Sequence, residues 1–211
     1  MQTNFFIVRH GQSIGNAWKR YLGHTDLGLS ELGHKQAKDA AIALAEQKID
    51  LIYSSDLRRA HETAVPHAEI HGLDIIDTQE FREVNVGDWE GMAVADLKKL
   101  YYQEFVIDWQ GNFGTFKFPN GESVLHAAER FYNEIKRIAD SNPGKNIIIT
   151  SHAAVIRAFW CKICGIAPED MAKAFPFPVN ASYSTLSYDG EKFTPIRYSV
   201  DDHLQTISVL E

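Results

Sequence analysis

The chain has 211 residues, of which 45% are hydrophobic and 23% charged, so it can bury one sizeable core and is expected to form a single domain over residues 1–211. A formal net charge of −7 argues against a broad basic surface for nucleic acid. The apolar runs are strand-sized and the N-terminus carries no secretory signal pattern, so we expect a cytoplasmic protein without membrane contact.

The first half of the chain alternates strand and helix patterns. The run Asn4 to Arg9 predicts an opening strand, and a loop with several glycines follows it. Ser30 suits the N-cap position of a helix that continues to about Lys48. The further elements expected here are a strand at 50–54, a helix at about 57–71 and a strand at 74–77.

The second half continues this pattern with one long interruption. Residues 103–122 combine aromatics, glycines and a proline, and we expect a partly ordered insertion that acts as a lid or binding loop. The pair Asp189-Gly190 between two strand patterns predicts a hairpin. The other expected elements are helices near 93–105 and 123–140, a strand at 146–150, a helix from about 153, and strands near 182–188 and 192–198.

This alternation predicts an α/β fold, a three-layer sandwich in which helices cover both faces of a mostly parallel central sheet. Ligands of such sheets bind in the loops that follow the carboxyl ends of the strands. Three strand ends therefore become candidates, and they carry Arg9-His10-Gly11, the segment 54–60 with Arg58 and Arg59, and Ser151-His152-Ala153.

The residue types at these strand ends are those that transfer a phosphoryl group. Arginine offers a planar fork that matches phosphate oxygens and stays charged at any working pH. Histidine near neutral pH can be an unprotonated nucleophile. A carboxylic acid such as Glu83, in a loop within reach, can donate a proton to a leaving alcohol. Such a site needs neither a metal ion nor a cofactor.

The ordered motifs resemble those of the histidine phosphatase superfamily, which has the phosphoglycerate mutase-like fold. Arg-His-Gly alone arises by chance, but the whole ordered set spans nearly the entire chain and is specific. The matching segments are Arg9-His10-Gly11-Gln-Ser13-Ile-Gly-Asn16, Gly23, Asp26 to Ala37, Ser55 to Ala64, Arg82 to Gly91, Gly121-Glu122-Ser123 and Ser151-His152-Ala153.

The resemblance implies a role for each matching residue. His10 attacks phosphorus and becomes phosphohistidine. Glu83 is the implied general acid and then the base that activates water, although Glu80 and Glu90 lie nearby. His152 would contribute most if it were cationic. The residues implied to hold the phosphoryl group or the substrate are Arg9, Asn16, Gly23, Arg59, His152 and Ala153, with Arg59 selected over Arg58 because it directly precedes alanine.

The two cysteines and one pair of histidines are types of residue that can also bind a metal ion. Cys161 and Cys164 form a Cys-x-x-Cys, but zinc would need about four ligands and no second pair exists, so we interpret both as small apolar residues of a helix. His67 and His71 lie one helical turn apart and could share a metal, yet no further ligand is placed with them in the sequence, so a structural role is favoured.

Hydrolysis of a small phosphomonoester is the leading functional prediction, and two alternatives remain. A cofactor-dependent phosphoglycerate mutase carries a tyrosine where this chain has Val86, which favours a phosphatase. A phospho-ligand binding protein without catalysis is disfavoured by the intact catalytic set. The 106–122 segment, with Lys117, is expected to carry the substrate determinants, and no pattern specifies the substrate or an oligomeric state.

Overall fold

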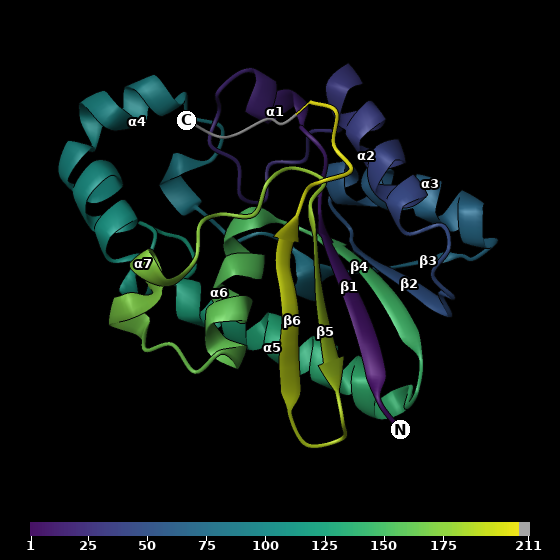
Figure 1. Cartoon of the computed structure of the whole chain (residues 1–211). Helices are drawn as coiled ribbons and strands as arrows, with labels where there is room; N and C mark the ends of the chain where they lie inside the picture. The colour runs from purple at the N-terminus through teal and green to yellow at the C-terminus, as the bar shows by residue number, and fades with distance from the viewer. Residues whose placement is uncertain (207–211) are drawn as a thin grey trace.

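The computed structural model describes residues 1–206, and six strands of this part form one sheet (Figure 1). The strands are β1 (Thr3–Arg9), β2 (Leu51–Ser55), β3 (Ile75–Thr78), β4 (Asn146–Ser151), β5 (Tyr183–Tyr188) and β6 (Phe193–Val200), in the order β3-β2-β4-β1-β5-β6. The first four of that order are parallel, whereas β5 and β6 are antiparallel at one edge. The predicted mostly parallel sheet and the hairpin at its end are confirmed.

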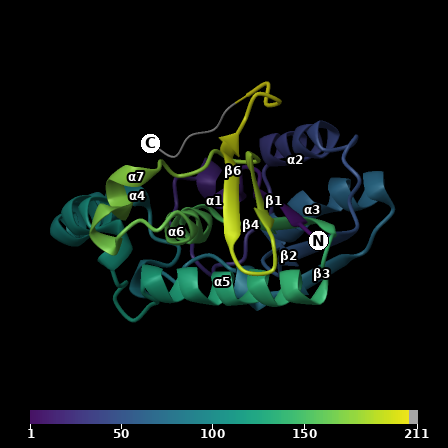
Figure 2. The ribbon, with the colours of Figure 1, turned by 60° about the horizontal axis from the view of Figure 1, so that its bottom comes forward.

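Two layers of helices cover this sheet. The α-helices of the described residues are α1 (Ile14–Ala17), α2 (Glu31–Ala43), α3 (Arg58–His71), α4 (Val94–Leu100), α5 (Val124–Ser141), α6 (Ala153–Ile163) and α7 (Met171–Ala174). Helices α2 and α3 pack together, as do α5 and α6. Figure 2 shows α2 and α5 on opposite sides of the sheet. Along residues 1–206, none of the helices has the length and hydropathy that crossing a membrane requires.

Alternate side chains of the central strands supply both cores. On β4, Ile147 and Ile149 join the cluster that includes α5 and α6, whereas Ile148 joins the cluster with Ala40 of α2 and Ala64 of α3. A strand buried on both faces needs apolar residues at every position, since successive side chains point to opposite faces. The run of three isoleucines therefore encodes the predicted three-layer architecture.

The helix after the glycine-rich loop begins as predicted and ends earlier. The backbone N–H of Gly33 donates to the Ser30 side chain at 3.1 Å, which confirms Ser30 as N-cap. Helix α2 stops at Ala43 instead of reaching residue 48. The next amides bond three residues back, with Leu44 donating to Ala41, so the chain tightens into a turn before it enters β2.

The predicted partly ordered insertion is a packed aromatic unit, so that expectation is wrong about its order. Helix α4 stops at Leu100 rather than near residue 105, and a stretch of π-helix, η3 (Tyr102–Trp109), and a 3₁₀ turn, η4 (Phe113–Thr115), follow. Its side chains Trp109, Phe113, Phe116 and Phe118 are all buried and contact one another. A π-helical hydrogen-bond pattern has no hydropathy signature, which is why the sequence did not reveal it.

Three short 3₁₀ turns complete the connections: η1 (Gln79–Phe81), η2 (Gly87–Trp89) and η5 (Pro168–Asp170). Trp89 in η2 is fully buried, and it packs against Phe105 and Phe118 beneath the insertion. Cys161 is buried on α6 as a free thiol and belongs to the core, which confirms its predicted role in packing.

Candidate active site

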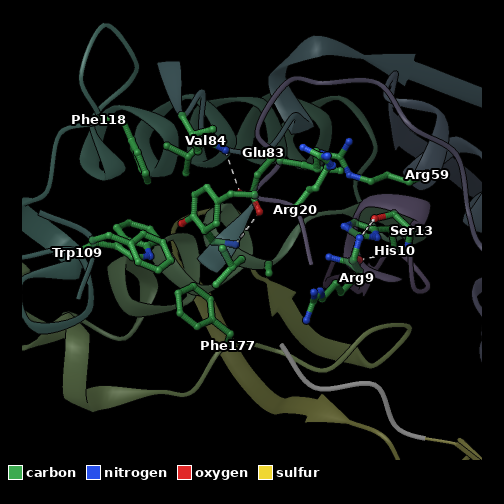
Figure 3. A pocket seen from close by; sticks show the side chains of 18 of the residues that line it. Arg9, His10, Ser13, Arg20, Arg59, Glu83, Val84, Trp109, Phe118 and Phe177 are labelled. Atoms are coloured by element: carbon green, nitrogen blue, oxygen red, sulfur yellow. Dashed lines mark hydrogen bonds between the residues drawn. The ribbon is translucent and has the colours of Figure 1, made fainter. Parts of the chain in front are cut away.

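A cavity of about 350 Å³ opens where the carboxyl ends of the parallel strands meet. Arg9 is the last residue of β1 and His10 follows it, whereas Arg59 lies in the first turn of α3, just after β2. All three line the cavity together with Glu83, which comes from the loop after η1 (Figure 3). The fold therefore brings together the predicted nucleophile His10, the two arginines and the predicted acid Glu83.

The His10 imidazole is buried and held in one tautomer. Its Nδ1 lies 2.7 Å from the carbonyl oxygen of Gly11, and because a carbonyl can only accept, Nδ1 carries the hydrogen and Nε2 keeps its lone pair. Burial, then the charges of Arg59 and Arg9, lower the pKa of His10 well below its ordinary value. The ring is therefore neutral near pH 7, the state that a nitrogen nucleophile requires.

The backbone around His10 is fixed by its neighbours. The Asn180 side-chain amide donates to the His10 carbonyl oxygen at 3.0 Å. The Gly11 N–H donates to the Thr63 hydroxyl at 3.0 Å. A Cβ on Gly11 would lie 2.4 Å from the carbonyl oxygen of Gly33, so only glycine allows α2 to approach this closely. The imidazole is thus oriented before any substrate arrives.

Two buried guanidinium groups flank the histidine. Arg59 donates to the carbonyl oxygens of Thr25 at 2.9 Å and Gly23 at 2.7 Å, and Arg9 donates to the carbonyl oxygen of Pro178. Burial lowers the pKa of each arginine to about 10, so both remain cationic at neutral pH. Arg58 lies on the exposed side of the same helical turn, where it pairs with Glu62, which agrees with the choice of Arg59.

The Glu83 carboxylate is anchored on the N-terminus of α6. Its Oε1 accepts the N–H of Val84 and of Val155, each at 2.9 Å, and its Oε2 accepts the N–H of Ala154 at 3.0 Å. Oε1 therefore has two hydrogen-bond partners and Oε2 has one. Oε2 is thus the oxygen with more lone-pair capacity left to meet a substrate oxygen or a proton. The Glu83 carbonyl oxygen is also held, by Arg130 at 2.8 Å.

Geometry separates Glu83 from the other two glutamates considered. Glu90 accepts hydrogen bonds from the N–H groups of Gly23, His24 and Thr25, at distances between 2.6 and 3.2 Å, and so holds the loop before Arg59. Glu80 is exposed. Of these three carboxylates, Glu83 is the one that lines the cavity.

His152 lies behind His10, with ring centroids 5.1 Å apart. The ring is fully buried and is not among the residues lining the cavity in the described part of the chain. Its Nε2 lies 2.8 Å from the Ser55 hydroxyl. Burial, then the charge of Arg59, lower the pKa of His152 well below its ordinary value. His152 is therefore a neutral hydrogen-bonding group in the structure, and not the cation that would bind a phosphoryl group most strongly.

The remaining predicted residues occupy different places. Asn16 lines the cavity, and its side chain closes a capping box with Ser13 at the start of α1. Ala153 lines the cavity at the first position of α6. Gly23 is outside the set of cavity-lining residues within 1–206, and the structure shows it orienting the Arg59 guanidinium through its carbonyl oxygen.

The cavity extends away from His10, where the expected 106–122 segment contributes Trp109, Gln110 and Phe118, and the other residues lining that part were not expected from the sequence. Its apolar wall includes Tyr21, Val84, Val86, Phe105, Trp109, Phe118 and Phe177, and Arg20, Lys98 and Gln110 are its polar members. The aromatics of the 106–118 segment were a signal for part of this wall. No sequence pattern pointed to Phe177, because it belongs to a segment far from residues 106–118 in the sequence. Lys117 is exposed and is absent from the cavity lining of the described residues.

Known proteins resemble this chain over nearly its whole length. The family described as histidine phosphatase superfamily (branch 1) matches residues 5–201. Phosphoserine phosphatase 1 of Hydrogenobacter thermophilus is 31% identical over 96% of this chain and 94% of its own length. Phosphoglycerate mutase-like protein 4 of Arabidopsis thaliana is 30% identical over 97% and 88% of the two chains.

A solved structure shares both the fold and part of the sequence. The mycobacterial glucosyl-3-phosphoglycerate phosphatase complexed with VO3 has a TM-score of 0.88 and 29% identity, covering 94% of this chain and 99% of that one. The family match extends over nearly the whole chain and includes every strand end that lines or supports the cavity. The chain belongs to the histidine phosphatase superfamily.

Proposed function

We propose that this protein is a phosphomonoester hydrolase that forms a phosphohistidine on His10, without a metal ion or cofactor, and acts on a small phosphorylated molecule in the cytoplasm. The observation that carries the proposal is the neutral His10 ring, whose Nδ1–H is bound by Gly11 so that Nε2 holds the lone pair. This nitrogen shares one cavity with Arg9, Arg59 and the anchored Glu83.

In the first step, the His10 Nε2 lone pair forms a bond to phosphorus while the ester P–O bond breaks. Glu83 gives its proton to the departing alkoxide, so that the product leaves as a neutral alcohol. Arg9 and Arg59 balance the charge on the phosphoryl oxygens, and such preorganised donors are worth most where charge develops in a buried site.

In the second step, water attacks the phosphohistidine. Glu83, now a carboxylate, takes a proton from that water, the N–P bond breaks, and inorganic phosphate leaves with His10 restored. The same carboxyl group serves as acid and then as base, because giving its proton to the alkoxide leaves the carboxylate that water then reprotonates. Its hydrogen bonds to Ala154 and Val155 hold it in position for both steps.

The apolar side chains next to Glu83 favour hydrolysis. In a mutase the phosphoryl group on histidine passes to a second substrate molecule instead of to water. Val84 and Val86 are buried and line the cavity. They offer no hydrogen bond to a second phosphate group. Incubation with a phosphoglycerate and trace bisphosphoglycerate, followed by analysis for isomer and free phosphate, separates the two: dominant isomerisation would show that the protein is a mutase.

Rapid quench with a ³²P-labelled aryl phosphate tests the covalent step directly. The wild type with chelator present should show an acid-labile, base-stable label during turnover, and His10→Ala should show neither label nor turnover. Turnover without label, or turnover that chelation abolishes, rejects the mechanism. A wild type that binds phosphate but hydrolyses nothing identifies a binding protein instead.

A further inference from the structure

The half of the cavity farther from His10 is mostly apolar. Beyond Glu83 its lining includes the buried side chains of Val86, Trp109 and Phe118, each exposed by 4% or less. Figure 3 shows Trp109 and Phe118 on the side of Glu83 opposite Arg9 and His10. A phosphate bound near His10 therefore has its ester oxygen beside Glu83 and directs its alcohol part toward these rings.

A second wall segment, Phe177, comes from the connection after α7 and lies beside Trp109. Phe177 is 38% exposed, and its ring centroid lies 6.1 Å from that of Trp109 with the planes tilted by 36°. It meets Phe113 edge-on at 5.5 Å. The two segments, although far apart in the sequence, thus pack side by side and line one apolar slot.

Arg157 of α6 holds the second wall in place. Its guanidinium carbon lies 4.4 Å from the ring centroid of Phe177 and 4.3 Å from that of Phe113, so it stacks against both. Its Nη2 also donates to the carbonyl oxygen of Ala172 at 2.7 Å. The side chain is absent from the cavity lining of the described residues, and it acts through the aromatic rings.

The polar groups at this end are few. Arg20, Lys98 and Gln110 are exposed, and Arg20 is engaged with the carbonyl oxygen of Gly91 at 2.7 Å. The Tyr21 hydroxyl is a further polar group of the lining, on a ring that packs against Trp109 and Phe118. An alcohol with several hydroxyl groups would lose hydrogen bonds to water against the valines and aromatic rings, which costs free energy. An apolar alcohol gains free energy from the same burial.

We propose that this slot binds the leaving alcohol and that the protein prefers phosphate monoesters of apolar alcohols, with Phe177 as a specificity-determining residue and Arg157 as the residue that positions it. The proposal rests on the proposed function. It assigns the preference to the step in which phosphate passes to His10, because the alcohol departs before water attacks the phosphohistidine.

The test compares phosphate esters of primary alcohols, so that the acidity of the leaving group varies little. The panel is 2-phenylethyl phosphate, ethyl phosphate, glycerol 3-phosphate and O-phosphoserine, each assayed with chelator. Burial of one phenyl group should raise kcat/KM for 2-phenylethyl phosphate at least about tenfold over ethyl phosphate. Equal values, or a preference for glycerol 3-phosphate or O-phosphoserine, would overturn the proposal.

Two variants locate the preference. Phe177→Ala and Arg157→Lys should each lower the ratio of phenylethyl to ethyl kcat/KM, with the loss appearing in KM more than in kcat. Tyr102→Ala is the control, because Tyr102 is a 60% exposed aromatic of η3, the stretch that also carries Trp109, and lies outside the cavity lining of residues 1–206. It should keep the wild-type ratio.

The two proposals fail in different ways. If the wild type forms phosphohistidine with all four esters but shows no apolar preference, only the slot is refuted. If Phe177→Ala and Arg157→Lys keep the wild-type ratio while retaining its thermal stability, the slot is refuted as well. If no ester is hydrolysed and no acid-labile label forms, the proposed function itself fails.

Discussion

Glu83 and Val155 are joined by a 2.9 Å hydrogen bond, in which the backbone N–H of the α6 first turn donates to the carboxylate Oε1. Helix α6, which begins right after His152, therefore positions Glu83, the candidate acid. A helix N-terminus presents unpaired N–H groups and partial positive charge, so a carboxylate seated there is held without another side chain.

Glu83→Gln should separate proton transfer from anchoring. The amide oxygen can still accept the N–H groups of Val84 and Val155, the Ala154 N–H loses its acceptor, and the side chain has no acidic proton to give. We expect kcat/KM for ethyl phosphate, which reports phosphoryl transfer to His10 and not the later attack by water, to fall by a factor on the order of 100 to 10,000. The fall should be much smaller for 4-nitrophenyl phosphate, whose leaving group needs no proton. Steady-state kinetics on the two substrates measure this, with exposed Glu80→Gln as control; equal losses would exclude Glu83 as the acid.

Arg59→Ala should cost far more activity than Arg58→Ala, although the two residues are adjacent. Arg59 is buried and lines the cavity, whereas the Arg58 side chain is exposed beside Glu62. Loss of one donor to developing charge costs about 3 kcal/mol, roughly a hundredfold in rate. Comparing kcat/KM for the two variants checks this, and similar losses in both would contradict the orientation of α3.

Ser55→Ala should weaken catalysis through His152. The hydroxyl lies 2.8 Å from His152 Nε2, and the His152 ring lies against His10. Removing the hydroxyl should cost about 1–3 kcal/mol of folding stability. It should also let the two rings shift, which lowers kcat/KM by roughly tenfold to hundredfold. Ser54→Ala is the matched control, because its hydroxyl donates to the backbone carbonyl oxygen of Ser55. Wild-type activity in Ser55→Ala would argue against a positioning role for this contact.

The His10 ring should stay neutral when the pH falls through 6.5. Its pKa in the folded protein is lowered by burial and then by Arg59 and Arg9, so protonation is delayed to more acidic solution. NMR of the His10 ring nitrogens between pH 7.5 and 5.5 should show no titration. Arg59→Ala removes the largest of the opposing charges and should shift the pKa upward. A wild-type midpoint at or above 6.5 would contradict the proposed ground state.

His67 should make the protein less stable in acid. Burial lowers its pKa to about 3 in the folded state, and neither ring nitrogen has a hydrogen-bond partner among the described residues. Between about pH 3 and 6.5 the His67 ring therefore binds a proton in the unfolded chain but not in the folded protein. The free energy of unfolding then decreases as the pH decreases, by at most about 1.4 kcal/mol per pH unit from this residue.

His67→Leu should flatten that dependence by about the same amount, because leucine has no proton to bind. Urea denaturation at pH 7, 6 and 5 measures the slope. His34→Leu, at an exposed position of α2, is the control and should keep the wild-type slope. An unchanged slope in His67→Leu would show that another buried group controls acid stability.

Much of the fold could be read from local patterns. The isoleucines of β4 specify a strand buried on both faces, Ser30 specifies the start of α2, and Asp189-Gly190 specifies the final hairpin. These signals depend on neighbouring residues alone, so chain order reveals them. The end of α2 and the π-helical stretch η3 could not be read, because packing and backbone hydrogen bonding decide them.

The sequence by itself determined the chemistry of the site, because Arg9, His10, Arg59, Glu83 and His152 lie in motifs whose order and residue types point to phosphoryl transfer. Only the tertiary structure decided the protonation states and the shape of the cavity. Burial sets the charge on the histidines, and the apolar slot exists because Trp109 and Phe177, from distant segments, pack side by side. Neither effect is local in the chain, since both depend on which surfaces meet in the folded protein.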